Sequence, residues 1–480
     1  MIPDGIEIPE ALPIAGGWVG VKAVAPVVFP YDGTIVAHAP VGDADSAKLA
    51  LESALAVELA ASELPSRLRH DLLARCWTRI DQQRDELEVL LVLETGKPLR
   101  DCRVEVQRAM LTLELAAQEA LRVHGETVPL DLLPSGDGMF GYFQRVPIGV
   151  VVGIAGFNYP FLLAMHKIAP SVAAGCPVIC KPAPQTPLST LWLGALMRAS
   201  ARDVGAPVDL VQIITGGVTV GEVLTTDPRI GAVSFTGSTT VGHAIARAAA
   251  PRKVLLELGS NAAMLVAADA DLEEAASAVV RGGFYASGQA CISVQRVIVE
   301  QAVYDTFEDL VRERAAKIVV GDPRDERTEV SALIDERATA RVTSWVDNAV
   351  LHGATPVVGG TEGGLRPTIL RDVTDSDEVW SEEVFGPVVA MRSVPDFEAA
   401  IEAANQSRYG LQASVWTRSL ATAMEAIRRL RVGGVIVNEV PGFRSDAMPY
   451  GGVKNSGNGR EGPRFAIEEL TVTKMAVIRP

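Results

Sequence analysis

Two side chains in this sequence have the types and settings that covalent catalysis uses, Cys291 and Glu257. Cys291 stands in SGQACISVQ (287–295), where small residues precede it and let a ligand approach closely. A reactive cysteine needs an accessible site that favours its thiolate, although most free cysteines are buried and inert. Glu257 ends the apolar run KVLLE, where burial would raise its pKa towards that of a general base. Alone, each residue also fits a structural role, as a core thiol or as a capping or ion-paired carboxylate.

Polar or glycine-containing positions follow three other apolar runs. Asn158 in GIAGFNYPF could hold an oxyanion through its amide, or form an Asx turn. Lys181 ends VICK, and α/β sheets bind ligands at the carboxyl ends of their strands; a solvated lysine is the alternative. Gly237 and Ser238 in VSFTGSTTVG join a strand to a helix start, whose N–H groups can bind phosphate. The GxGxxG fingerprint is absent there, so a plain turn remains open.

Two sets of strands are needed to bring these positions together. Residues 44 to 122 are predicted to be helical, because apolar residues recur at three- and four-residue steps, with a break at ETGKP (94–98). Two series of apolar runs follow, separated by helical stretches: 148–155, 177–181, 209–214 and 232–236, then 262–266, 294–299, 387–391 and 434–438. This alternation predicts an α/β fold with two parallel-sheet units, divided near residue 259.

Two segments fit neither unit. GYFQRVP (141–147) and the C-terminal TVTKMAVIRP alternate polar and apolar residues. They are predicted to be exposed strands that pair outside the main sheets and could join subunits.

Composition and charge exclude several classes of protein. The 480 residues carry a net charge of −15, which argues against nucleic-acid binding. The N-terminal residues lack an apolar core, so no signal peptide is predicted. An uncharged run at 146–165 is long enough for a bilayer, but its Pro, Gly, Asn and Tyr residues favour a strand, a loop and a helix start. Five sparse cysteines and six scattered histidines predict no metal site, and we expect a soluble cytoplasmic protein.

Seven motifs occur in the order and spacing of one family: GFNYP, CKP, FTGSTTVG, LELG, GQAC, EEVFGP and PYGGVKNSGNGRE. Over nearly its whole length, from ETGKP to TVTK, the chain resembles the aldehyde dehydrogenase superfamily. The resemblance implies an aldehyde-dehydrogenase-like fold, with a Rossmann-like NAD(P)-binding domain at 1–124 and 148–259, a catalytic domain at 260–454, and oligomerisation strands at 125–147 and 466–480. It also implies a homodimer or homotetramer, NAD or NADP as cofactor, and a small aldehyde as substrate.

The resemblance gives individual residues their roles. Cys291 corresponds to the nucleophile that forms a thiohemiacetal and then a thioester, while Asn158 and the Cys291 N–H hold the oxyanion. Glu257 corresponds to the base that activates water, and Lys167 to a lysine that supports this site. The expected cofactor-binding residues are Lys181, Gly217, Gly221, Phe235, Gly237, Ser238, Leu258, Glu383 and Phe385.

One departure from the family pattern concerns the cofactor. Many NAD-preferring members have a Glu three residues after Lys181, where this sequence has Pro184. Loss of that carboxylate removes a repulsion against a 2′-phosphate, so we expect NADP to be accepted.

Three residues are expected to bind the substrate: Arg444, Arg296 and Phe161. The two arginines would anchor the negatively charged tail of a semialdehyde or a similar aldehyde. Arg444 could instead pair with Asp446 or a nearby Glu and never meet the substrate.

Two other functions share the same resemblance. A coenzyme-A-acylating enzyme would transfer the acyl group to a thiol, but such members typically lack the base, and Glu257 and Glu383 are both present here. A catalytically silent scaffold should have lost Cys291, Glu257 or Asn158, and all three are present.

Overall fold

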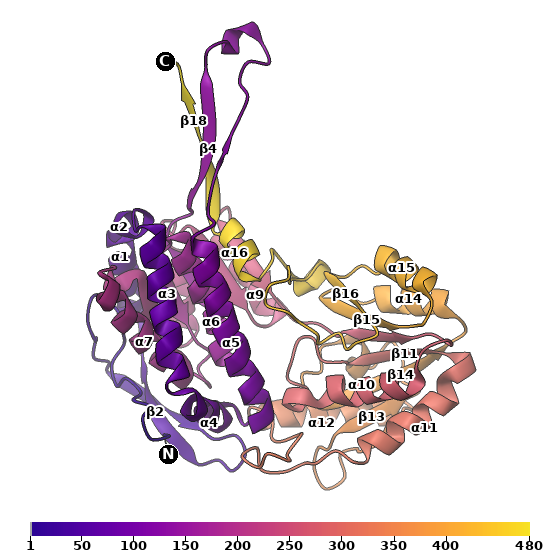
Figure 1. The fold of residues 1–480 in the computed structure, drawn as a ribbon. Coiled ribbons are helices and arrows are strands. Elements are labelled where there is room, and N and C mark those ends of the chain that lie inside the picture. Colours follow the sequence, from indigo (N-terminus) through magenta and orange to yellow (C-terminus); the bar gives the residue numbers. More distant parts are fainter. Residues whose placement is uncertain (1) are drawn as a thin grey trace.

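The structure is a computed structural model that describes residues 2–480. It has two lobes and a projecting β arm (Figure 1). The first lobe contains a six-stranded sheet of order β17-β9-β8-β5-β6-β7. Its strands are β5 Val151–Ile154, β6 Val178–Lys181, β7 Val211–Ile213, β8 Ala232–Thr236, β9 Lys253–Glu257 and β17 Gly457–Asn458. Strands β5 to β9 are parallel, as their apolar runs predict, and β17 joins one edge antiparallel.

Helices cover both faces of this sheet. On one face, α6 and α7 pack on the strands, and α3 and α5 form a further layer over them. The helices of this lobe are α1 Ala44–Ala56, α2 Glu58–Ser62, α3 Ser66–Asp81, α4 Arg84–Thr95, α5 Leu99–Ala120, α6 Pro160–Ala174, α7 Leu188–Val204, α8 Val218–Thr226, α9 Thr239–Ala249 and α16 Pro463–Glu469. The predicted helical region is confirmed, and ETGKP ends α4 because Gly96 takes a left-handed φ of 70°.

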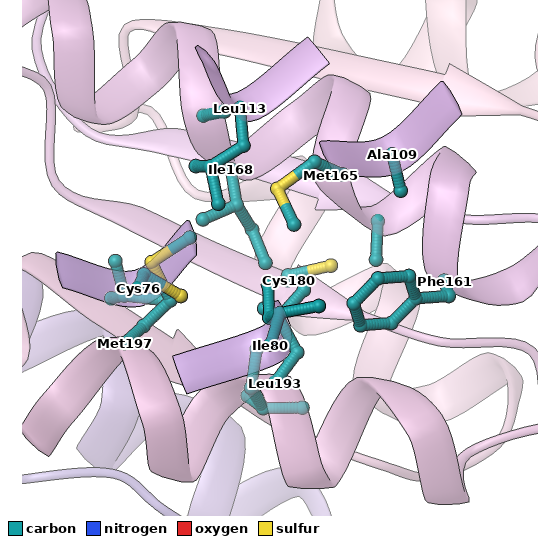
Figure 2. Packing of buried hydrophobic residues seen from close by; sticks show 14 of the residues in the cluster. Cys76, Ile80, Ala109, Leu113, Phe161, Met165, Ile168, Cys180, Leu193 and Met197 are labelled. Atoms are coloured by element: carbon teal, nitrogen blue, oxygen red, sulfur yellow. The ribbon is translucent and has the colours of Figure 1, made fainter. Parts of the chain in front are cut away.

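The two faces of the sheet belong to separate hydrophobic cores, because side chains alternate along a strand. Val178 and Cys180 of β6 lie in the core under α6 and α7, whereas Ile179 lies in the core under α1 and α8. Figure 2 shows the first of these cores, in which Phe161 and Cys76 pack among Leu, Ile and Met side chains. Both residues are fully buried.

The second lobe contains a seven-stranded sheet of order β12-β13-β14-β11-β10-β15-β16. Its strands are β10 Ala263–Val266, β11 Arg296–Glu300, β12 Thr355–Val358, β13 Thr368–Arg371, β14 Val388–Val394, β15 Gln412–Trp416 and β16 Gly434–Val437. Its helices are α10 Leu272–Phe284, α11 Tyr304–Ala315, α12 Glu336–Leu351, α13 Glu378–Ser381, α14 Phe397–Asn405 and α15 Leu420–Arg429. The apolar runs predict β10, β11, β14 and β16 but miss β12, β13 and β15. In β15, Gln412 and Ser414 interrupt the pattern although both are buried.

The arm is a three-stranded antiparallel sheet of order β18-β4-β3 that stands away from both lobes (Figure 1). Its strands are β3 Glu126–Thr127, β4 Phe140–Pro147 and β18 Thr471–Ile478. The two predicted outlying strands therefore pair with each other along their whole length. Residues 466–469 are the end of α16 and not strand. A further hairpin that contacts α4 is not predicted from the sequence. It consists of β1 Ala23–Val28 and β2 Ile35–Val41.

The uncharged run at 146–165 divides as predicted. It contains β5, a loop at residues 155–159, and the first turns of α6. The run lacks charge because β5 and nearly all of α6 are buried inside the first lobe. No helix in residues 2–480 combines the length and apolar character needed to cross a membrane.

Candidate active site

A cleft of about 790 Å³ lies between the lobes, a volume in the range of small-ligand sites. One wall comes from the β8–α9 turn, the end of β9 and the loop between β5 and α6. The other comes from residues 281–292, 382–385 and 440–450. Ligands of parallel α/β sheets bind beyond the carboxyl ends of the strands, and three such ends meet at this cleft.

Cys291 reaches the cleft from a loop with an uncommon backbone conformation. Just before it, Ala286 and Ser287 take left-handed φ values of 48° and 55°. The Ala286 N–H donates a hydrogen bond of 2.9 Å to Asp101 of α5, which fastens the loop to the first lobe. The other cysteines are buried, whereas Cys291 is partly exposed. Desolvation of the sulfur raises the pKa of Cys291 to about 12, so the resting group is a thiol.

Asn158 lies in the loop between β5 and α6, and its amide has a fixed orientation. Its Nδ2 donates to the Gln289 carbonyl at 2.9 Å, which uses one of the two amide N–H groups. Lys97 holds the Asn158 carbonyl at 2.9 Å and forms a buried ion pair with Glu105. Glu105 in turn accepts the N–H of Phe161 at the start of α6, at 3.0 Å. The second amide N–H of Asn158 therefore remains for a ligand.

Glu257 ends β9 at the same cleft. Its side chain is buried, and its Oε1 has no hydrogen-bond partner within residues 2–480. Burial and repulsion by Glu461 raise the pKa of Glu257 well above its usual range, although Lys167 and Arg444 oppose the shift. A raised pKa makes the ionised carboxylate a stronger base, which suits it to take a proton from water.

Five predicted cofactor residues line the cleft: Gly237, Ser238, Leu258, Glu383 and Phe385. At the β8–α9 turn, the Ser238 side chain makes no capping bond to the helix N–H groups. The neighbouring Thr236 Oγ1 is buried without a hydrogen-bond partner in the described part of the chain. A helix start with free donors fits a phosphate group of NAD or NADP.

Glu383 and Phe385 lie together in another part of the same cleft. Glu383 accepts the Ser260 N–H at 2.9 Å, and burial raises the pKa of Glu383 to about 7. A side chain at position 259 would crowd Glu383, since a Cβ added to Gly259 would lie 2.5 Å from its Oε2. The Phe385 ring meets the Phe157 ring edge-on at 5.5 Å. A carboxylate beside an aromatic pair fits a ribose hydroxyl and a flat ring.

The other four predicted cofactor residues are not among those lining the cleft. Lys181 ends β6, and its buried Nζ lies 3.4 Å from the Pro182 carbonyl. Gly217 caps α8, and Gly221 lies within that helix. Phe235 is buried in the core beneath the turn, where its ring lies 2.6 Å from the position of a Cβ added to Gly237. Phe235 therefore shapes the turn from below.

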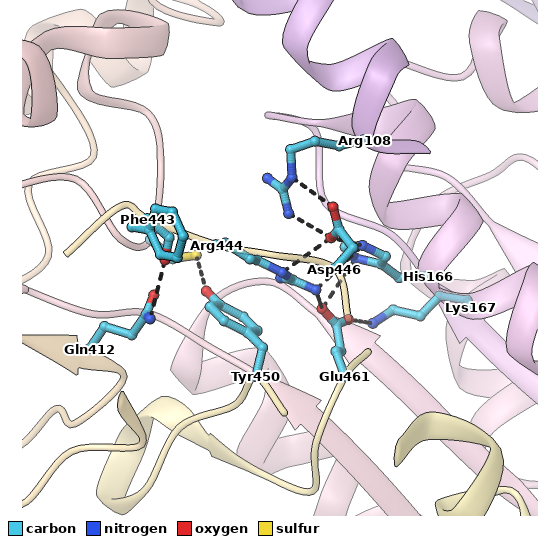
Figure 3. Close-up of polar contacts among 10 residues, drawn as sticks. Arg108, His166, Lys167, Gln412, Phe443, Arg444, Asp446, Tyr450 and Glu461 are labelled. Carbon is cyan, nitrogen blue, oxygen red and sulfur yellow. Dashed lines mark hydrogen bonds and ion pairs between the residues drawn. The ribbon is translucent and has the colours of Figure 1, made fainter. Parts of the chain in front are cut away.

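A cluster of charged side chains, four of which line the cleft, lies next to Tyr450 (Figure 3). We call it the charged cluster; it consists of Arg108, His166, Lys167, Arg444, Asp446 and Glu461. The sequence predicts roles for only Lys167 and Arg444. Glu461 ends the motif NSGNGRE and could have been found there, whereas Arg108 and His166 carry no sequence signal. In residues 2–480, no set of His, Cys, Asp and Glu side chains is arranged to hold a metal ion.

The charged cluster is tightly paired. Arg108 binds Asp446 with two bonds, of 3.0 and 2.8 Å, and Lys167 binds Glu461 at 2.7 Å. Burial opposes ionisation of Asp446, but hydrogen bonds from His166 and Arg108 outweigh it and lower the pKa of Asp446. The pKa of Glu461 is likewise lowered against burial, chiefly by Lys167 and His166. Both carboxylates are therefore ionised.

Arg444 combines the two alternatives that the sequence leaves open. It lines the cleft, and it pairs with Glu461 at 3.0 Å and with Asp446 at 3.4 Å. Its guanidinium also lies 3.8 Å above the Tyr450 ring. The Tyr450 hydroxyl is 3.4 Å from the Cys291 sulfur, so one aromatic side chain separates Arg444 from the thiol.

Two predicted substrate residues lie elsewhere, and neither lines the cleft. Phe161 points into the core of the first lobe, where its ring is 6.2 Å from that of Trp192 (Figure 2). Arg296 begins β11, and its guanidinium binds main-chain carbonyls of Asn261 and Ala403 inside the second lobe. The chain turns into a buried strand directly after Cys291, so nearness in sequence does not place Arg296 near the sulfur.

Known proteins resemble this chain over nearly its whole length. The aldehyde dehydrogenase family model matches residues 18–476. The 3-sulfolactaldehyde dehydrogenase of Priestia megaterium is 42% identical over 413 residues, which are 85% of this chain and 86% of the relative. The structure of aldehyde dehydrogenase 21 from Physcomitrella patens, in complex with the reaction product succinate, matches with a TM-score of 0.94 and 33% identity over 98% of both chains. Glyceraldehyde-3-phosphate dehydrogenase from Methanocaldococcus jannaschii, complexed with NADP, matches with a TM-score of 0.92 and 31% identity over 96% of this chain and all of the other. The chain thus belongs to the aldehyde dehydrogenase family.

Proposed function

We propose that this enzyme oxidises a short aldehyde with an anionic tail, through a thioester on Cys291. The observation that carries the proposal is the charged cluster beside the sulfur. Its cations are Arg108, Lys167 and Arg444, and its ionised carboxylates are Asp446 and Glu461. The cluster therefore keeps one unit of uncompensated positive charge before His166 is counted, on largely buried side chains at a wall of the cleft, where charge is weakly screened.

Cys291 would start the reaction. Its proton passes to solvent in the cleft, and the thiolate attacks the aldehyde carbon to form a thiohemiacetal. One Nδ2–H of Asn158 is used by the Gln289 carbonyl. The other Nδ2–H and the Cys291 N–H would donate to the negative oxygen. Preorganised donors of this kind stabilise charge without rearranging during the reaction.

The cofactor half of the cleft would hold NAD(P). Gly237 and Ser238 would bind its phosphates, and Glu383 and Phe385 its ribose and ring. When bound, NAD(P)+ supplies the acceptor for the hydride that leaves the substrate carbon. Residues 1–124 and 148–259 would then form the cofactor domain, and residues 260–454 the domain that carries the nucleophile.

Glu257 would complete the reaction by removing a proton from water. The resulting hydroxide attacks the thioester carbon, the C–S bond breaks, and the acid is released. The buried, unpartnered Oε1 of Glu257 supports this role, because a carboxylate without other partners is available to water. Lys167 would keep Glu461 ionised and would favour the ionised, basic form of Glu257.

Two similar proteins act on or bind anionic molecules. The relative from Priestia megaterium is a 3-sulfolactaldehyde dehydrogenase, and the structure from Physcomitrella patens holds succinate. A carboxylate is planar and a sulfonate is tetrahedral, and both are oxyanions that arginine recognises well. We therefore propose an aldehyde with a carboxylate or sulfonate tail.

Replacing Arg444 with glutamine tests the tail. We expect kcat/KM for succinate semialdehyde to fall about tenfold to a hundredfold, because one charge-assisted hydrogen bond is lost. For the neutral aldehyde butanal, kcat/KM should change much less, so the ratio of the two values is the readout. Arg444→Lys, which keeps the charge, should restore part of that ratio. Equal losses for both aldehydes would refute recognition of the tail by Arg444.

We also propose that the arm joins two copies of the chain. Large apolar side chains are exposed on β18, at Val472, Met475, Val477 and Ile478. A second exposed apolar stripe runs along α15, at Leu420, Met424 and Ile427, next to the edge strand β16. Both surfaces are too apolar for free strands and helices in water, and the arm of one copy can cover the stripe of another.

Replacing Met475 and Val477 with aspartate together tests this contact. We expect light scattering after gel filtration to give a monomer mass for the variant and a dimer or tetramer mass for the parent protein. Leu59→Asp is the matched control, since Leu59 is an even more exposed apolar residue on α2, and it should leave the mass unchanged. A variant that keeps the parent mass would exclude the arm as the subunit contact.

We propose a cytoplasmic location from the state of the thiols. The five cysteines of the chain are all free, and none is paired in a disulfide. This usage is typical of a reducing compartment.

A further inference from the structure

We propose that Tyr450 is a catalytic residue, which donates a hydrogen bond to the Cys291 thiolate and raises the amount of active nucleophile. The inference rests on the proposed role of Cys291. The Tyr450 Oη lies 3.4 Å from the Cys291 Sγ, and both groups line the cleft. The Tyr450 hydroxyl has none of the nucleophile, base, oxyanion or cofactor roles described above.

The direction of this hydrogen bond changes with the state of the sulfur. In the thiol form, either the Cys291 S–H or the Tyr450 O–H can donate. A thiolate has no proton, so only the Tyr450 hydroxyl can then donate. Hydrogen bonds to ionised groups are roughly twice as strong as neutral ones, so the contact favours the thiolate over the thiol. It thereby opposes the desolvation that disfavours ionisation of Cys291.

The hydroxyl is held firmly in place for this task. The backbone of Tyr450 pairs with that of Glu461 in both directions, through bonds of 3.1 and 2.6 Å. Tyr450 is only 3% exposed. Arg444 lies 3.8 Å above its ring, where a cation binds the π face and draws electron density away from the hydroxyl. Burial meanwhile keeps Tyr450 in its neutral form, so that it retains the proton that it donates.

Four other titratable groups face Cys291 besides Tyr450, and they act on the sulfur through space: Glu257, Glu383, Arg444 and Tyr285. Glu257 and Glu383 disfavour the thiolate and Arg444 favours it. Tyr285 is a useful contrast, because it also lines the cleft but its buried hydroxyl has no hydrogen-bond partner among residues 2–480.

The test is the rate at which iodoacetamide alkylates Cys291, measured without aldehyde or cofactor from about pH 7 to about pH 10. The thiolate attacks the methylene carbon of iodoacetamide, a C–S bond forms and iodide leaves, so the rate follows the thiolate fraction. The other cysteines are buried, and Cys291→Ala gives their background rate. We expect Tyr450→Phe to shift the profile up by about one pH unit, which is a tenfold lower rate at a fixed pH.

The matched control is Tyr285→Phe, which removes a cleft hydroxyl that is not bonded to the sulfur and should leave the profile in place. An unshifted profile for Tyr450→Phe, or an equal shift for Tyr285→Phe, would overturn the inference. Thermal unfolding of each variant shows whether the fold is kept. The proposed function fails separately, if Cys291→Ala retains aldehyde oxidation, so the two failures can be told apart.

Discussion

Replacing Cys291 with alanine is expected to lower kcat/KM for aldehyde oxidation by about 10⁴-fold or more, since loss of a nucleophile removes the covalent route entirely. NAD(P)H formation measured with succinate semialdehyde is the assay. The variant should still bind NAD(P), because the Cys291 side chain bonds to Tyr450, whereas Glu383 bonds to Ser260. Cofactor binding can be followed by the quenching of tryptophan fluorescence.

Cys76→Ala is the matched control for loss of a thiol. Cys76 is fully buried in the core of the first lobe (Figure 2), and it does not line the cleft. Its removal should lower the melting temperature slightly and leave kcat/KM close to that of the parent enzyme. Substantial oxidation by Cys291→Ala would show that another group carries the acyl intermediate.

Replacing Glu257 with glutamine is expected to separate the two halves of the reaction. Thioester formation needs no base to activate water, so the variant should release about one equivalent of NAD(P)H per active site in a rapid burst. Turnover after the burst should be about a hundredfold to ten-thousandfold slower than in the parent enzyme, the usual contribution of a general base. Rapid-mixing measurement of NAD(P)H distinguishes the burst from the steady state.

The pH dependence gives a second readout for Glu257. Burial raises the pKa of Glu257, and only the ionised carboxylate can take a proton from water. In the parent enzyme, kcat should therefore rise with pH through that raised pKa, and this rising limb should be absent from Glu257→Gln. If the parent enzyme turned over rapidly only when free coenzyme A was added, the acyl group would be transferred to coenzyme A and not to water, and the acylating alternative would replace hydrolysis.

The catalytic half of the site can be read from the sequence because its residues follow apolar strands. Glu257 ends β9 and Asn158 lies in the loop after β5, and parallel strands bring their carboxyl ends to one edge. Gly237 marks the strand-to-helix turn by its residue type. Fold class follows from the same runs, although β15 escapes because its buried Gln412 makes the strand look polar.

The substrate end cannot be read in this way, because it is assembled from distant loops and helix faces. Arg108 contacts Asp446 from 338 positions away along the chain, and neither residue stands in a distinctive local pattern. Arg296 shows the opposite error. It lies five positions from Cys291, yet β11 carries its side chain into the interior, where main-chain carbonyls surround it. Spacing along a chain predicts which residues lie near each other on one helix or strand, but not which distant segments the fold brings together.

The sequence separation between contacts also has a consequence for biosynthesis. Tyr450 follows Cys291 by 159 positions, and β4, which pairs with only two residues of β3, gains its long partner only when the ribosome has made β18. A nascent or truncated chain therefore holds its thiol without the phenol and the arginine beside it, and exposes half of an unpaired ribbon. The complete thiol site waits for Tyr450 and the complete arm for Ile478, so both form only at the end of translation, and until then the open edge of β4 can associate with other chains.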